Sequence, residues 1–119
     1  MEPRLIYKVA HSITKIEWLN TTVENGAWVF IGDGPELKKE FIFKSIEEFF
    51  SDNTLYVSWT RTGSKAVLKN NIELELKGIL GENDFSIWDS KFEKVVEFKS
   101  TGVMRFGMAE PWHPEQHKV

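Results

Sequence analysis

The chain contains no cysteine, and none of its apolar runs approaches the length of about 18 residues that a membrane-spanning helix needs. Without cysteine there is neither a disulfide framework nor a thiolate nucleophile. The N-terminus lacks a basic segment followed by an apolar run, so we expect no secretory signal. These absences together predict a protein of a reduced, cytoplasmic compartment that does not enter a membrane.

Clustered positive charge is also missing from the sequence. The net charge is −3, and direct binding of nucleic acid needs grouped Lys and Arg side chains, so nucleic acid is not the expected ligand. Three stretches, residues 16–37, 45–60 and 78–90, contain acidic residues and no Lys or Arg. They indicate either solvated loops or a surface that presents negative potential to a basic partner.

Signatures of catalysis and of cofactor binding are absent as well. The sequence has no nucleophile elbow, no phosphate-binding glycine loop and no dinucleotide fingerprint. His113 and His117 have the spacing of a metal pair on a helix, but Pro114 stands between them. Glu73 and Glu75 are expected on the solvent side of a strand, where carboxylates catalyse little. We therefore expect no enzyme, no cofactor and no bound metal.

Aromatic residues, in contrast, are abundant. The 119 residues include five Trp and nine Phe, and such rings supply the largest buried area per residue. A chain of this length buries about two-thirds of its unfolded surface, so residues 1–119 form one domain with a substantial core. Residues 109–119 hold two Pro and two His with little to bury, and we expect a loosely ordered tail there.

The segment from residue 39 to 61 is the expected centre of the fold. Alternating Phe side chains predict a strand over residues 39–44. Ser45 and Glu48 have the spacing of a capping box, which predicts that a short helix begins at Ser45. A Ser-Asp-Asn turn follows, and alternation over residues 55–59 predicts a second strand.

The remaining pattern predicts an α+β domain. Residues 27–31 and 39–44 are interpreted as a hairpin around the loop Gly32-Asp33-Gly34-Pro35, whereas residues 12–20 fit either a helix capped by Ser12 or a strand. We expect a mostly antiparallel sheet of six or seven strands with one or two helices packed on one face. Further strands are predicted at residues 4–10, 72–77, 91–98 and 103–108.

With chemistry unsupported, surface recognition is the remaining class of function. Trp is among the residue types that most often dominate a binding interface, and acidic loops beside exposed aromatic rings suit the basic groove of a nuclease. We expect a protein partner to contact the following residues: Asp33, Glu36, Glu47, Glu48, Asp52, Trp59, Glu82, Asp84, Trp88 and Asp89.

The segments GAWVFIGDG and KEFIFKSIEEFFSDNTLYVSW, in a small acidic chain without cysteine, resemble bacterial toxin-immunity proteins of contact-dependent growth inhibition systems. The resemblance implies a cytoplasmic monomer or weak dimer that binds one cognate toxin domain, often a nuclease, and blocks its active site. Two alternatives stay open. One is a small-molecule-binding or accessory domain with a pocket lined by Trp and Phe, and the other is an enzyme whose carboxylates converge only in the fold.

Overall fold

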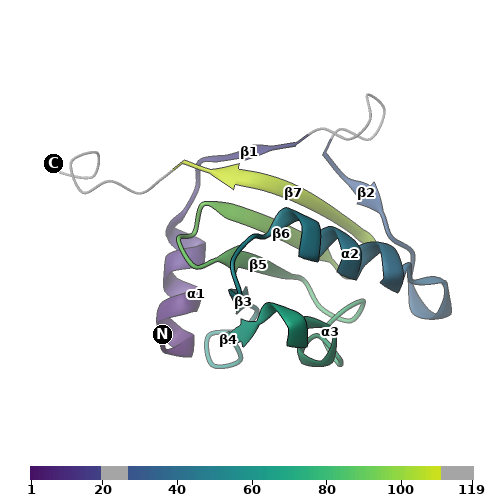
Figure 1. The fold of residues 1–119 in the computed structure, drawn as a ribbon, viewed down its shortest axis with the longest axis horizontal. Helices are drawn as coiled ribbons and strands as arrows, with labels where there is room; N and C mark the ends of the chain where they lie inside the picture. Colours follow the sequence, from purple (N-terminus) through teal and green to yellow (C-terminus); the bar gives the residue numbers. More distant parts are fainter. Residues whose placement is uncertain (20–26, 111–119) are drawn as a thin grey trace, which may run out of the picture.

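The longest strand, β7 (Val103–Ala109), organises a seven-stranded antiparallel sheet in the computed structural model, which describes residues 1–19 and 27–110 (Figure 1). One edge of β7 pairs with β6 (Lys94–Lys99), and the other edge is shared by β1 (Ile16–Trp18) and β2 (Val29–Phe30). Beyond β6, the sheet continues through β5 (Phe85–Asp89), β3 (Thr54–Ser58) and β4 (Lys65–Leu68).

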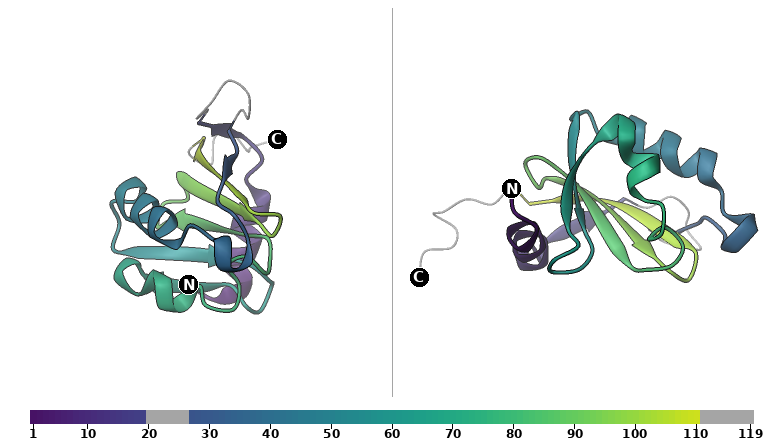
Figure 2. Two further views of the ribbon diagram at one scale, coloured as in Figure 1. Left: turned by 90° about the vertical axis from the view of Figure 1, so that its right-hand side faces the viewer. Right: turned by 90° about the horizontal axis from the view of Figure 1, so that it is seen from below.

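Helices cover both faces of this sheet (Figure 2). Helices α2 (Lys39–Phe49) and α3 (Ile72–Glu75) lie on one face, and α1 (Pro3–Ser12) lies on the other. The predicted α+β class with an antiparallel sheet is confirmed. The expected placement of helices on one face only is wrong, because α1 occupies a segment that had been interpreted as a strand. Two short 3-10 helices, η1 (Gly34–Glu36) and η2 (Lys69–Asn71), complete the elements of the described part of the chain.

The main core lies between α2 and the sheet. Ile42, Ile46 and Phe50 are fully buried and recur at the spacing of one helical face. A smaller cluster on the opposite face joins Ala10 of α1 to Trp88. The sheet side of the main core is formed by Leu55, Val57, Ile87, Val96, Phe98 and Met104.

The prediction of a strand over residues 39–44 is wrong, because α2 begins at Lys39. Ile42 stands four residues before Ile46 and extends the buried stripe by one turn, while Phe41 is 44% exposed. Ser45 therefore lies inside the helix and does not cap it. The predicted hairpin is also wrong, since β2 pairs with β7.

The strands predicted at residues 4–10 and 72–77 are helices in the structure. Ile6 and Ala10 are buried at a spacing of four residues, as are Ile72 and Leu76. Leu74, which completed the apparent alternation, is 64% exposed. In both segments the buried residues therefore recur every four positions, as they do on one face of a helix. The alternation of apolar and polar residues, which predicts a strand, does not correspond to burial there.

Hydrogen bonding and strand pairing define the ends of the remaining helices and strands. Residues 16–18 form strand β1, and Ser12 ends α1, where its hydroxyl donates to the Val9 carbonyl at 2.7 Å instead of capping a helix start. The strands predicted at residues 55–59, 91–98 and 103–108 are confirmed with shifted ends. Ala109 pairs with Ile16 and is buried, so it does not belong to a loose tail. The rest of the expected tail, residues 111–119, lies outside the described residues.

Two lysines from distant parts of the chain satisfy the C-terminal carbonyls of α2. The Lys94 ammonium donates to the Phe49 carbonyl at 3.0 Å, and the Lys69 ammonium donates to the Phe50 carbonyl at 2.8 Å. A helix C-terminus carries partial negative charge and unpaired carbonyls, so both contacts stabilise the end of α2. Within residues 1–19 and 27–110, no helix is sufficiently long and apolar to cross a membrane.

The buried stripe of α2 predicts a large stability difference between two neighbouring substitutions. Ile46→Ala removes a fully buried side chain and should lower the free energy of unfolding by about 3 kcal/mol. Phe41→Ala removes a larger but 44% exposed ring and should cost less than about 1 kcal/mol. Urea denaturation followed by circular dichroism measures both values. Equal losses would contradict the orientation of α2.

Candidate functional site

Helix α1 covers only part of the sheet face on which it lies (Figure 2). We call the uncovered part the open face, and a row of polar side chains crosses it. Register pairs place Ser58 of β3 opposite Ser86 of β5, Ser86 opposite Glu97 of β6, and Glu97 opposite Arg105 of β7. Successive side chains of a strand point to opposite faces, and residues that pair directly across two strands point to the same face. These four residues therefore lie on one face of the sheet. We call Ser58, Ser86, Glu97 and Arg105 the polar row.

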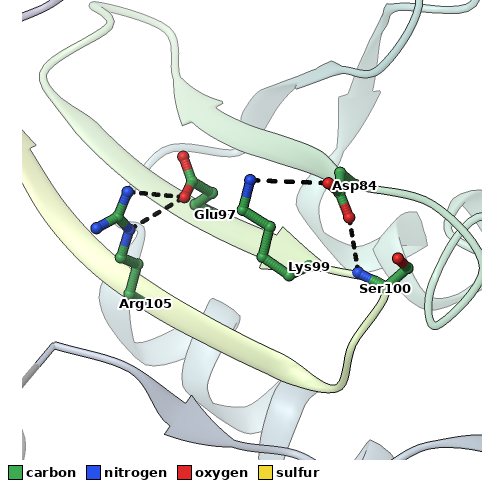
Figure 3. Close-up of polar contacts among 5 residues, drawn as sticks. All are labelled: Asp84, Glu97, Lys99, Ser100 and Arg105. Atoms are coloured by element: carbon green, nitrogen blue, oxygen red, sulfur yellow. Dashed lines mark hydrogen bonds and ion pairs between the residues drawn. The ribbon is translucent and has the colours of Figure 1, made fainter. Parts of the chain in front are cut away.

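Arg105 at the end of the polar row is held between two indole rings. Its guanidinium carbon lies 3.7 Å from the ring centroid of Trp18 and 4.2 Å from that of Trp28. Its Nε and Nη2 atoms donate to one carboxylate oxygen of Glu97, at 3.0 Å and 2.9 Å (Figure 3). Stacking and charge-assisted hydrogen bonds therefore fix the planar group in one orientation.

A glycine makes room for this arrangement. Gly107 pairs with Trp18 across β7 and β1, and a Cβ atom at Gly107 would lie 2.7 Å from Cε3 of the Trp18 ring. Any larger residue would push the ring away from the sheet. The position of Trp18 over Arg105 thus depends on the missing side chain at residue 107.

A second row of paired residues, Phe30, Val103 and Lys99, lies closer to the β6–β7 turn on the same face. It is apolar at Phe30 and charged at Lys99. Phe30 is 62% exposed and pairs with Val103, which pairs with Lys99. The Lys99 ammonium lies 3.7 Å from a carboxylate oxygen of Asp84 (Figure 3). Beside this row lies an open groove of about 610 Å³ lined by Trp28, Phe30, Lys99, Thr101 and Val103.

Asp33, Glu36, Glu82 and Asp84, four of the residues expected at an interface, are gathered at the sheet end that holds the β6–β7 turn. The Ile31 amide donates to the Gly102 carbonyl at 2.8 Å, which brings the loop at residues 33–36 to this turn. The Ser100 amide donates to Asp84 at 2.8 Å, and this bond, with the nearby Lys99, holds the pKa of the Asp84 carboxyl below its ordinary value of 3.8 (Figure 3). We call Asp33, Glu36, Glu82 and Asp84 the acidic end.

Three further expected residues, Glu47, Glu48 and Asp52, lie near the C-terminus of α2, toward the opposite end of β5. Hydrogen bonds from the Ser90 hydroxyl and amide hold the pKa of Asp52 below its ordinary value of 3.8. Lys69 and Lys94 cap the same helix end. The ten predicted residues therefore do not form one continuous acidic surface, and lysines stand among them at both ends.

The last three expected residues belong largely to the interior. Trp88 is 3% exposed and donates its indole N–H to the Ser86 hydroxyl at 2.9 Å. Asp89 is 8% exposed and accepts the amides of Glu93 and Lys94, which shapes the β5–β6 turn. Trp59 is half-buried against the main core. Trp88 and Asp89 were expected at the surface, and their burial removes both from a contact surface.

The Arg105 sandwich and Phe30 were not singled out from the sequence. The pairing of Glu97 with Arg105 follows from the turn at residues 100–102, because both lie equally far from its centre. The positions of the Trp18 and Trp28 rings over Arg105 could not be predicted from neighbouring residues, because β1 and β2 are distant from β7 in the sequence.

No protein-family model, curated protein sequence or solved structure matches this chain. Across residues 1–19 and 27–110, no group of three or more His, Asp or Glu side chains is arranged to hold a metal ion. The function must therefore be argued from the geometry of the open face itself.

The close packing of Trp18 on Gly107 predicts a sharp effect of one methyl group. Gly107→Ala should displace the Trp18 ring, weaken the stack on Arg105 and lower the free energy of unfolding by about 1–3 kcal/mol. Near-ultraviolet circular dichroism reports the ring environment, and urea denaturation reports the stability. Gly78→Ala is the control for adding a methyl group, because a Cβ at Gly78 has no atom within 4 Å, although its φ of +88° adds local strain. Unchanged aromatic dichroism in Gly107→Ala would contradict the predicted displacement.

The Asp52 hydrogen bonds predict a pH-dependent stability. The pKa of Asp52 is lower in the folded chain than in the unfolded chain, so its ionised form stabilises the fold above the unfolded pKa, and this stabilisation disappears as the pH falls through the folded pKa. Asp52→Asn should cost about 1 kcal/mol at pH 7, a modest value because the group is exposed. The difference from the parent chain should vanish near pH 2 in urea denaturation series. Glu48→Gln, which alters an exposed carboxylate on α2, is the matched control.

Proposed function

We propose that this chain is a cytoplasmic immunity protein that has no enzymatic activity and neutralises a cognate toxin domain by covering its active site. The observation that carries the proposal is the Arg105 sandwich beside the 62% exposed ring of Phe30. Arg and Trp are the residue types most enriched among interface hot spots, and here they are fixed before any partner arrives. The toxin we propose is a nuclease with a basic groove.

The open face supplies the anchors in this proposal. The charges of Arg105 and Lys99 are paired with Glu97 and Asp84, so the face adds little net charge of its own. Its contribution is the aromatic and guanidinium surface of Trp28, Phe30 and Arg105. Such contacts govern how slowly a complex dissociates.

The acidic end supplies the long-range attraction. Asp33 and Glu36 are exposed in the loop that follows β2, and Glu82 is exposed in the loop before β5. They lie at the border of the face that holds Phe30, since the first loop is bonded to the β6–β7 turn. A basic groove would be drawn toward this border, which accelerates association at low ionic strength. The complex we propose contains one copy of each protein.

A small-molecule-binding or accessory role is the second candidate. It is favoured by a cleft of about 400 Å³ near α2 and α3, which lies within the usual size of ligand sites. Apolar side chains of Leu37, Phe43, Leu76 and Leu80 line it beside Lys39 and Glu73. This cleft lies on the sheet face opposite the Arg105 sandwich, so separate variants test the two roles.

The proposal predicts protection against a neighbouring gene product, because immunity genes stand beside toxin genes in the systems that this chain resembles. The protein encoded directly upstream should arrest bacterial growth when expressed alone and degrade nucleic acid in vitro. Co-expression of this chain should restore growth, and the two purified proteins should form a one-to-one complex. An upstream product that is harmless, or that stays toxic and unbound in the presence of this chain, would contradict the proposal.

The anchors and the acidic end should affect different rate constants of that complex. Phe30→Asp should weaken binding by at least about tenfold, mainly through faster dissociation. Reversing Asp33, Glu36 and Glu82 to Lys should slow association about tenfold at low salt and much less at high salt. Surface plasmon resonance at two salt concentrations measures both constants. The matched control is Glu47→Lys with Glu48→Lys, which reverses charge at the other end of the molecule and should leave both constants unchanged.

A further inference from the structure

A small depression lies between the polar row and the C-terminal end of α1. Its volume is about 160 Å³, and its polar lining consists of His11, Ser58, Asp84, Ser86, Glu97 and Lys99. The aromatic residues Trp59, Phe85 and Phe98 complete the lining. Three members of the polar row thus form one wall, while the fourth, Arg105, lies next to it.

Ser58 is the unusual member of this lining. It is 3% exposed, and its hydroxyl has no hydrogen-bond partner among the described residues. Buried hydroxyl groups in folded proteins are nearly always paired, so the unpaired hydroxyl of a residue that lines a depression needs an explanation. Its neighbour in the row, Ser86, already accepts the indole N–H of Trp88. A hydrogen-bonding group of a bound molecule would satisfy Ser58.

Two carboxylates in the lining, those of Asp84 and Glu97, leave acceptor positions open to a ligand. Both bonds from Arg105 reach the same oxygen of Glu97, Oε1, which leaves the second oxygen available (Figure 3). Nδ1 of His11 donates to the Tyr7 carbonyl at 2.9 Å, which leaves Nε2 as the ring nitrogen that can meet a ligand. The one cationic group, the Lys99 ammonium, pairs with Asp84. The lining itself holds two carboxylates and one ammonium, so a cationic hydrogen-bond donor would complement the acceptors that remain open.

We propose that this depression receives the guanidinium group of an arginine side chain from the protein partner. A guanidinium spreads its N–H donors over a planar fork, and it can therefore bridge acceptors on neighbouring strands, such as Ser58 with Ser86 or Ser86 with Glu97. A lysine ammonium is a compact charge and would reach fewer of them. The inference rests on the proposed function, because a basic toxin domain presents such side chains.

The test uses the isolated chain and methylguanidinium chloride as the probe. In ¹H–¹⁵N correlation spectra, the probe should shift the amide signals of Ser58, Ser86 and Glu97 with saturation at millimolar concentration. Methylammonium chloride should bind at least fivefold more weakly, and sodium acetate at equal ionic strength should leave these signals in place. Shifts that grow linearly without saturation, or that acetate reproduces, would overturn the proposal.

The Ser58→Ala variant tests whether the Ser58 hydroxyl binds a ligand or only contributes to the stability of the fold. Because the hydroxyl is unpaired, the variant should be at least as stable as the parent chain in urea denaturation, yet it should bind methylguanidinium at least fivefold more weakly. Ser51→Ala, on an exposed residue outside the depression, is the matched control and should bind normally. Equal binding by Ser58→Ala and the parent chain would overturn the assignment.

The two proposals fail separately. Probe binding without protection from the upstream gene product would retain the arginine site and reject the toxin partner. Protection without probe binding would retain the immunity function and reject the arginine site.

Discussion

The register of β7 against β6 is the constraint on which the rest of the molecule depends. A shift of β7 by one residue would carry Met104 and Phe106 out of the main core and bring Arg105 into it. The free energy of burying those apolar side chains therefore determines the register. The same register aligns the four residues of the polar row across four strands. The candidate site is thus a direct consequence of how the core packs.

The open face offers packing contacts around Arg105 and long-range electrostatic attraction at the acidic end. Arg105 is immobilised by stacking and by Glu97, so little conformational entropy remains to be lost when a partner binds there. Asp33, Glu36 and Glu82 are exposed on loops, where charge acts over a distance comparable to the Debye length. A surface built in this way can attract a partner by charge and retain it by packing.

The C-terminal pair of strands, β6 and β7, was predictable from the sequence. The turn at residues 100–102 and the alternation on either side of it locate β6 and β7, and the wider α+β class follows from the count of strands. The helices were harder, because short helices with few apolar residues can mimic alternation. Leu74 completes such a pattern between Ile72 and Leu76 although it faces solvent. Only the burial of residues four apart, as in Ile6 and Ala10, distinguishes the helix.

The site was less predictable than the fold, because it joins segments that have no local relation. Trp18 and Trp28 meet around Arg105 only because β1 and β2 occupy the same edge of β7. Acidic residues, in contrast, are visible in the sequence, but their grouping is not. Glu82 and Asp33 share one end of the sheet, whereas Asp52 lies near Ser90 at the other.

Backbone hydrogen bonds hold the strands together whatever side chains point outward from the sheet. The residues on the outward face can therefore differ from those that stabilise the fold. Residues 58, 86, 97 and 105 alternate with the inward positions that hold the domain together. Exchanging the outward set alters the chemical pattern offered to a partner while the inward set keeps the architecture intact. A few substitutions on such a surface would therefore change its chemistry without changing the shape of the molecule.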